Sequence, residues 1–177
     1  MDKKVLMVWF SRPNENYAVG DVEVGNTAVL GEKIIESLKR KGIAADTFVI
    51  IPKNQYPVDY QSCIAQATAE QKASARPEYV GNVTDFSQYS TVFLGYPIWW
   101  GDMPMIVYNF LEKHDFSNKQ IIPFCTHEGS GDSGTHAHLS SLFANTTVLP
   151  GFDCTGSKAR SDEIQADVDK WVDSLPL

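Results

Sequence analysis

The sequence predicts an α/β protein in which helices cover both faces of one parallel β-sheet. Short apolar runs alternate with amphipathic stretches along the chain, and the runs are nearly continuous in apolar residues. Strands of that kind are buried on both faces, as happens when right-handed crossovers place helices above and below a parallel sheet. The expected architecture is therefore a three-layer α/β/α sandwich.

Five apolar runs have the length and residue types of strands, and they cover residues 3–10, 44–51, 91–96, 120–126 and 146–149. Helical patterns lie between and after these runs, and they cover residues 27–41, 60–75, 103–114, 135–144 and 162–175. The first is the clearest, because its apolar residues recur at helical spacing up to Leu38 before Gly42 closes the element. Such a five-stranded parallel sheet fits the order 2-1-3-4-5, with ligands beyond the carboxyl ends of the first and third strands.

Length and composition narrow the classes of protein to which the chain could belong. The chain has 177 residues, 43% of them hydrophobic, and no Pro, Gly or Ser-rich linker, so we expect one domain over residues 1–177. A net charge of -7 with scattered basic residues argues against a nucleic-acid partner. The widely spaced Cys63, Cys125 and Cys154 favour free thiols in a reducing compartment. Because the apolar start is too short for a signal peptide or a membrane span, we expect a cytoplasmic protein without a membrane partner.

The loop after the third predicted strand is unusually aromatic. It contains Tyr96, Pro97, Ile98, Trp99, Trp100 and Gly101. Paired Trp side chains in a connection bury little surface unless something flat lies against them, and proline stiffens the backbone. The loop is either a hydrophobic plug against a helix or another subunit, or a stacking surface for a planar ligand.

The loop after the first predicted strand is longer than is usual for such turns. It ends in Gly25, Asn26 and Thr27. A glycine and capping side chains at a helix start leave backbone amides free for an anion such as phosphate. Ser11 and Arg12 would add a hydroxyl and a local cation. Because Asp21 and Glu23 would repel an anion, we expect the segment 13–24 to fold away from it.

The loop after the fourth predicted strand is rich in small hydrogen-bond donors. It contains Thr126, His127, Glu128, Gly129, Ser130, Gly131 and Asp132. The three loops follow strands that are contiguous in the order 2-1-3-4-5, so they would share one edge of the sheet. An anion site, an aromatic wall and a donor-rich turn together indicate a site for a phosphorylated planar heterocycle.

These three loops resemble those of the flavodoxins and flavodoxin-like FMN proteins, and the resemblance spans nearly the whole chain. It implies a flavodoxin-like fold with noncovalently bound FMN. The phosphate would lie at Ser11, Arg12 and residues 25–27, the isoalloxazine beside residues 96–101, and the pyrimidine edge at residues 126–132. Two departures stand out: the interruption of the phosphate loop by residues 13–24, and His127 where many flavodoxins carry a Tyr.

The resemblance implies redox chemistry by the flavin without a catalytic acid from the protein. One interpretation is an electron carrier that docks on redox partner proteins, which the acidic surface favours. Another is an NAD(P)H-dependent enzyme that reduces quinones or similar acceptors, which His127 and the long first loop favour. A third is a flavin-free binding module.

Two other motifs give weaker evidence for a binding site than the three loops do. Residues 129–134 match G-x-G-x-x-G, with Asp153 in the position of a ribose-binding acid, but too little chain follows for a dinucleotide fold. A zinc site from Cys125, His127, His136 and His138 is also disfavoured, because a spacing of two on a helix makes the last two side chains diverge.

Overall fold

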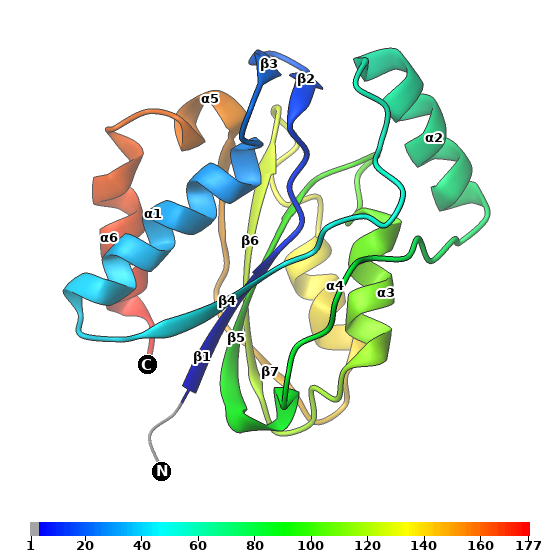
Figure 1. Cartoon of the computed structure of the whole chain (residues 1–177). Helices are drawn as coiled ribbons and strands as arrows, with labels where there is room; N and C mark the ends of the chain where they lie inside the picture. The colour runs from blue at the N-terminus through cyan, green and yellow to red at the C-terminus, as the bar shows by residue number, and fades with distance from the viewer. Residues whose placement is uncertain (1–3) are drawn as a thin grey trace.

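A computed structural model describes residues 4–177, and Figure 1 shows one central sheet with helices on both faces. Within these residues the sheet has the order β4-β1-β5-β6, followed by β7 and β8, and all its strand pairs are parallel. The strands are β1 (Lys4–Trp9), β4 (Ala45–Val49), β5 (Tyr89–Pro97), β6 (Gln120–His127), β7 (Thr147–Val148) and β8 (Phe152–Thr155). The predicted order 2-1-3-4-5 is confirmed, with the last position divided between two strands. Lys3, the first residue of the first predicted strand, lies outside the described residues.

The division of the last strand corrects the prediction of one strand over residues 146–149. β7 pairs with the start of β6, where Gln120 lies opposite Thr147, and β8 pairs with its end, where Phe124 lies opposite Phe152. Pro150 between them has no N–H to donate to a ladder. Because β8 continues to the end of β6, it carries the chain up to the edge where the predicted site lies.

The five predicted helices are confirmed to within a few residues at their ends. The helices are α1 (Asn26–Arg40), α2 (Tyr60–Lys72), α3 (Met105–Lys113), α4 (Thr135–Leu142), α5 (Gly156–Ala159) and α6 (Ile164–Ser174), with a 3-10 turn, η1 (Phe86–Gln88). The four-residue α5 was not predicted. In Figure 1, α1, α5 and α6 lie on one face of the sheet, and α2, α3 and α4 lie on the other. None of these helices has the length and apolar character needed to cross a lipid bilayer.

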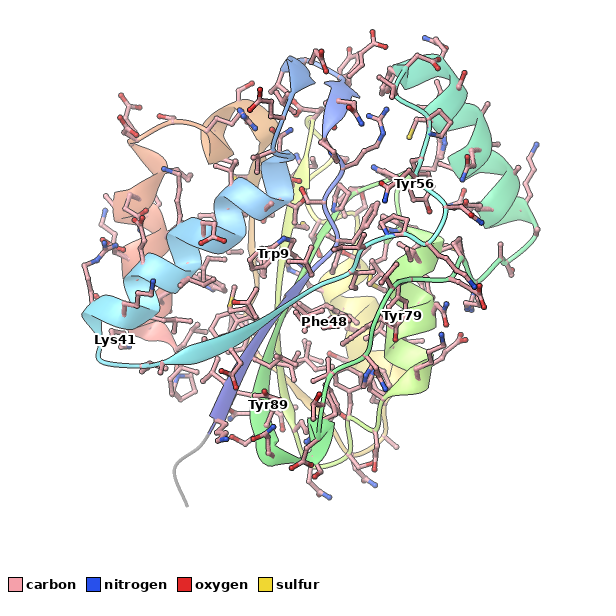
Figure 2. All side chains as sticks on the ribbon, in the orientation of Figure 1. Trp9, Lys41, Phe48, Tyr56, Tyr79 and Tyr89 are labelled. Carbon is pink, nitrogen blue, oxygen red and sulfur yellow. The ribbon has the colours of Figure 1, made fainter. Side chains whose placement is uncertain are left out.

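The core has two layers, one on each face of the sheet. Along β1, Met7 and Trp9 pack toward α1 and α6, whereas Leu6 and Val8 pack toward α3. Figure 2 shows side chains filling the space between the ribbons on both sides of the sheet, with Trp9 labelled among them. Burial on both faces is the physical reason why the central strands β1, β5 and β6 are nearly continuous in apolar residues, whereas the edge strand β4 is largely exposed.

The segment 13–24 folds into a small antiparallel hairpin, β2 (Asn14–Asn16) and β3 (Gly20–Val22). The hairpin stands above the carboxyl ends of the parallel strands, at the top of Figure 1. Asp21 and Glu23 are exposed, in keeping with the expected avoidance of an anion site. The segment does not leave the site altogether, because its tip returns to the pocket described below.

Candidate functional site

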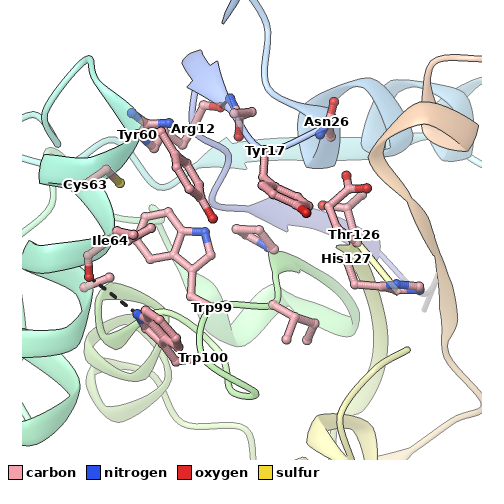
Figure 3. Close-up of a pocket in the computed structure, with 15 residues that line it drawn as sticks. Arg12, Tyr17, Asn26, Tyr60, Cys63, Ile64, Trp99, Trp100, Thr126 and His127 are labelled. Atoms are coloured by element: carbon pink, nitrogen blue, oxygen red, sulfur yellow. Dashed lines mark hydrogen bonds between the residues drawn. The ribbon is translucent and has the colours of Figure 1, made fainter. Parts of the chain in front are cut away.

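A pocket of about 210 Å³ opens at the carboxyl ends of β1, β5 and β6, between the hairpin, α2 and the two following loops (Figure 3). Nine residues predicted for the site line it: Arg12, Asn26, Pro97, Ile98, Trp99, Trp100, Thr126, His127 and Glu128. Six other lining residues were not predicted: Asn16, Tyr17, Tyr60, Cys63, Ile64 and Ala67. No sequence pattern marks these six residues, because only tertiary packing brings α2 and the hairpin tip beside the three loops.

Several predicted residues lie behind or beside this lining. Ser11, Gly25 and Thr27 form the turn into α1, and Gly101 follows Trp100 in its loop. Gly129, Gly131 and Asp132 are farther along the third loop, where Asp132 accepts a hydrogen bond from the backbone N–H of His136 at 3.2 Å. Asp132 therefore holds the start of α4.

Tyr96 lies in the core, which corrects its predicted place in the pocket. Its side chain is 0% exposed and its phenol donates to the hydroxyl of Thr135 at 2.9 Å. Because β5 continues to Pro97, Tyr96 is a strand residue that points into the layer between the sheet and α4. Alternation along the strand directs its side chain to the face that α4 covers, and both faces of β5 are buried.

The turn into α1 has the features of an anion site. Gly25 precedes the helix with no side-chain cap, and Ser11 Oγ accepts from the backbone N–H of Ala28 at 3.0 Å. The first N–H groups of the 15-residue helix lack intrahelical acceptors, so they and the helix dipole favour a negative group there. A Cβ on Gly25 would lie 2.3 Å from Ser11 Oγ, so only glycine allows this close approach.

A buried pair of hydroxyls joins this turn to the third loop. Thr27 Oγ1 lies 2.8 Å from Thr126 Oγ1, and the two residues are 1% and 4% exposed. The pair connects chain positions that are 99 residues apart. It therefore fixes the distance between the expected phosphate end and the expected ring edge.

Arg12 is directed away from the predicted phosphate role. The residue is 6% exposed, and its terminal nitrogens donate to the backbone carbonyls of Glu15, Pro57 and Val58. With these nitrogens used, the guanidinium holds the hairpin against the segment before α2. The sequence did not reveal this, because the acceptors Pro57 and Val58 are more than forty residues away.

Arg160 instead brings a positive charge to the start of α1. Its Nη1 donates to the carbonyl of Val24 at 2.9 Å and to Asn26 Oδ1 at 3.1 Å. Nearby, Glu128 Oε1 accepts from the backbone N–H of Gly156 at 3.1 Å, which ties the third loop to α5. No sequence motif marks Arg160, because its proximity depends on the position of the unpredicted α5.

The two tryptophans of the aromatic loop are held very differently. Trp99 is partly buried and packs edge-on against Phe10 and Tyr56, with ring centroids 5.3 and 5.0 Å away. Trp100 is 59% exposed, and its indole N–H lies 3.4 Å from the carbonyl of Ile64 in α2. Trp99 thus forms part of the pocket floor, whereas Trp100 offers an open aromatic surface.

Trp100 and Gly101 form the centre of a tight turn. The N–H and carbonyl groups of Trp99 and Asp102 exchange hydrogen bonds of 2.9 and 3.2 Å across it. The φ angles of Trp100 and Gly101 are +52° and +72°, the left-handed values of a type I′ turn. A left-handed residue with a side chain costs about 1–2 kcal/mol, so the turn places Trp100 at some expense in stability.

Both ring nitrogens of His127 are used within the third loop and β8. Nδ1 accepts from the backbone N–H of Gly129 at 3.0 Å, so the proton of the neutral ring lies on Nε2 and donates to Asp153 at 2.9 Å. The ring therefore shapes the loop beside the pocket. Its hydrogen-bonding capacity is not directed at a ligand.

The α2 side of the pocket is uncharged at neutral pH. Burial raises the pKa of the Cys63 thiol, so this group stays protonated. Burial and the hydrogen bond to Glu70 raise the pKa of Tyr56, behind Trp99, in the same direction. With Tyr60, Ile64 and Ala67, these groups make a wall suited to an apolar, planar surface.

The chain is similar to known flavoproteins in sequence and in fold. The family model described as Flavodoxin matches residues 24–175. A candidate flavoprotein from Bacteroides eggerthii has a TM-score of 0.78 at 24% identity, covering 99% of each chain. A candidate flavoprotein from Bacteroides uniformis has a TM-score of 0.76 at 23% identity, covering 98% of this chain and 100% of the other. A Lactobacillus acidophilus flavoprotein solved with FMN has a TM-score of 0.65 at 18% identity, covering 96% and 98%. No curated protein matches the sequence.

Proposed function

Because the chain belongs to the flavodoxin family, we propose that it binds FMN noncovalently and transfers electrons through that flavin. The observation that carries the proposal is the meeting of an anion site at the start of α1 with an aromatic pocket at the same sheet edge. The Lactobacillus acidophilus relative, solved with FMN, supports the same ligand. Bound flavin would supply the redox chemistry, and the protein would bind, orient and shield it.

The structure suggests a role for each part of the site. Ser11 and the first amides of α1 would hold the phosphate, with Arg160 as the neighbouring cation in place of Arg12. Trp100 would present its indole face to the ring system, and Gly101 would present backbone to it. The remaining contacts would come from Pro97, Ile98, Thr126, His127 and Glu128.

Charge favours a carrier over an enzyme that takes hydride from a nicotinamide dinucleotide. Among the residues lining the pocket, Arg12 is the one Lys or Arg, and both its terminal nitrogens donate to backbone carbonyls. A dinucleotide pyrophosphate would find no lysine or arginine to pair with there. A net charge of -7 suits association with a basic redox partner protein instead.

FMN binding is tested by an absorption spectrum after saturation with FMN and removal of free ligand. We expect flavin bands to stay with the protein, and Trp100→Ala to release FMN more readily. Trp99→Phe keeps an aromatic ring against Phe10 and should retain most of the flavin. Val80→Ala, an exposed position outside the pocket lining, is the control. A parent protein that elutes colourless would refute the proposed function.

The electron donor is tested on the loaded protein under anaerobic conditions. A carrier should stay oxidised with NADPH alone and be reduced when a flavodoxin reductase is added. Rapid bleaching by NADPH alone would instead support the NAD(P)H-dependent enzyme that reduces quinones or similar acceptors.

A further inference from the structure

The hairpin β2–β3 carries a tyrosine at its tip that reaches the mouth of the pocket. Tyr17 follows β2 directly and is 62% exposed, yet its ring lines the pocket. Figure 3 shows the ring directed from the hairpin into the space between Trp99 and His127. Its nearest aromatic neighbour is Tyr60 at the start of α2, with ring centroids 5.9 Å apart and planes tilted by 33°.

The base of the hairpin is fastened to the segment before α2. Arg12 donates to the carbonyls of Pro57 and Val58 at 2.6 and 2.8 Å. The backbone N–H of Glu15 donates to the carbonyl of Val58 at 3.3 Å, and its carboxylate accepts from the N–H of Tyr60 at 2.7 Å. These hydrogen bonds hold the base of the hairpin in place, whereas Tyr17 at its tip stays largely exposed.

An aromatic side chain held in this way exposes much apolar surface until a ligand covers it. The third loop brings His127 to the pocket, and both its ring nitrogens are bonded within the protein. Trp99 and Trp100, the indoles of the pocket lining, both come from the loop after β5, so an aromatic wall on the opposite side has to come from another segment. Tyr17 is the aromatic residue of the hairpin that faces this space.

We propose that Tyr17 stacks on the outer face of the bound isoalloxazine and that the hairpin exists to place it there. The inference rests on the proposed function, because the ligand is the same FMN. It assigns Arg12 a positioning role: the guanidinium fixes the hairpin base that holds Tyr17. It also gives the segment 13–24 a function at the ring end of the ligand, away from the phosphate.

The test compares Tyr17→Ala and Tyr17→Phe with Val58→Ala, an exposed side chain next to the hairpin base that is outside the pocket lining. Stacking on a heterocycle supports a loss of affinity of about 10-fold for Tyr17→Ala. Riboflavin should lose affinity by the same factor, because the anion site is untouched. Iodide should quench the fluorescence of the remaining bound flavin more strongly. Tyr17→Phe and Val58→Ala should bind within about 2-fold of the parent, since each keeps the stacking ring.

Thermal melts of the apo variants check that they fold, which is expected because Tyr17 is exposed. A parent that binds FMN and a Tyr17→Ala variant with unchanged affinity and iodide quenching would overturn the inference while leaving the proposed function intact. Tighter binding by Tyr17→Ala would also overturn it, because the ring would then be a competing occupant of the pocket. Failure of the parent to bind FMN is a different result and refutes the proposed function itself.

Discussion

At the α1 end of the pocket the polar groups are backbone amides and short side chains held by buried hydrogen bonds, whereas at the α2 end large aromatic rings are exposed to solvent. Thr27 and Thr126 are 1% and 4% exposed, but Trp100 and Tyr17 are 59% and 62% exposed. The α1 end is defined by how closely three chain segments approach one another. The α2 end is defined by aromatic side chains that lie largely in solvent.

This difference separates recognition of charge from recognition of shape. Fixed amides at a helix start are preorganised for an anion, so they favour ligands that carry a phosphate. Exposed aromatic faces add contact area for any flat ring, with or without a phosphate. We therefore expect changes at the α1 end to discriminate FMN from riboflavin, and changes at the α2 end to affect both equally.

Gly25→Ala should have the largest effect. Its Cβ would lie 2.3 Å from Ser11 Oγ and 2.5 Å from the carbonyl oxygen of Arg12, so the turn has to shift. We expect FMN affinity to fall by about 100-fold and the free energy of unfolding by about 1–3 kcal/mol, as for other overpacked sites. Fluorescence titration with FMN and with riboflavin measures this, and riboflavin should be affected much less.

Gly42→Ala at the opposite end of α1 is the matched control. Gly42 has a φ of +75° and open space around its Cβ position, so the change strains the backbone without a clash. It should cost about 1 kcal/mol of stability and leave FMN binding unchanged. Equal loss of affinity in both variants would mean that helix stability, not the local turn, controls the α1 end.

Trp100→Gly should raise the stability of the apo protein and weaken the binding of FMN and riboflavin. Removing a side chain at a φ of +52° relieves about 1 kcal/mol of strain, so the apo protein should unfold at a higher denaturant concentration. Loss of the indole face should weaken FMN and riboflavin alike by about 10-fold. A larger loss of affinity for FMN than for riboflavin would contradict the proposal that the α1 end recognises the phosphate and the α2 end recognises the ring.

Ser11→Ala should give a smaller but selective effect. The variant loses the acceptor for the backbone N–H of Ala28, now bonded at 3.0 Å. In the proposed site the Ser11 hydroxyl also donates to the phosphate, and the loss of one such bond, about 1 kcal/mol, corresponds to a loss of about 5-fold in FMN affinity. Ser141→Ala, on the exposed end of α4, should change nothing. If riboflavin lost affinity to the same degree, the hydroxyl would be supporting the pocket as a whole.

The smallest effect concerns the pH dependence of stability and two partly buried histidines, His114 and His136. Burial lowers the pKa of His136 and of His114 below the ordinary value of 6.5, and for His136 it outweighs the nearby carboxylate of Asp132. Between 6.5 and the lowered pKa the unfolded chain binds more protons, so apo stability should fall as the pH drops below about 6.5. Urea unfolding at pH 7.5 and 5.5 should show a smaller difference in His136→Gln than in the exposed control His138→Gln.

The sequence alone determined the order of the parallel sheet and the approach of Ser11 to the start of α1. Apolar runs buried on both faces read as parallel strands, and the spacing of apolar residues marked the helices. Ser11, Gly25 and Thr27 could be placed together because a strand end and the next helix start are close in the chain. Strand order then predicted that the loops after β5 and β6 would meet them.

Tertiary structure decided the α2 end and the roles of individual side chains. Arg12 bonds carbonyls more than forty residues away, and Arg160 reaches Asn26 from a distance of 134 residues, so no local pattern marks either contact. Tyr96 and Tyr17 are both tyrosines near loops, but a central strand covered on both faces buries one and hairpin geometry exposes the other. Local sequence encodes which conformation a segment prefers, whereas the partner of a long or charged side chain depends on which distant segments the packed sheet brings beside it.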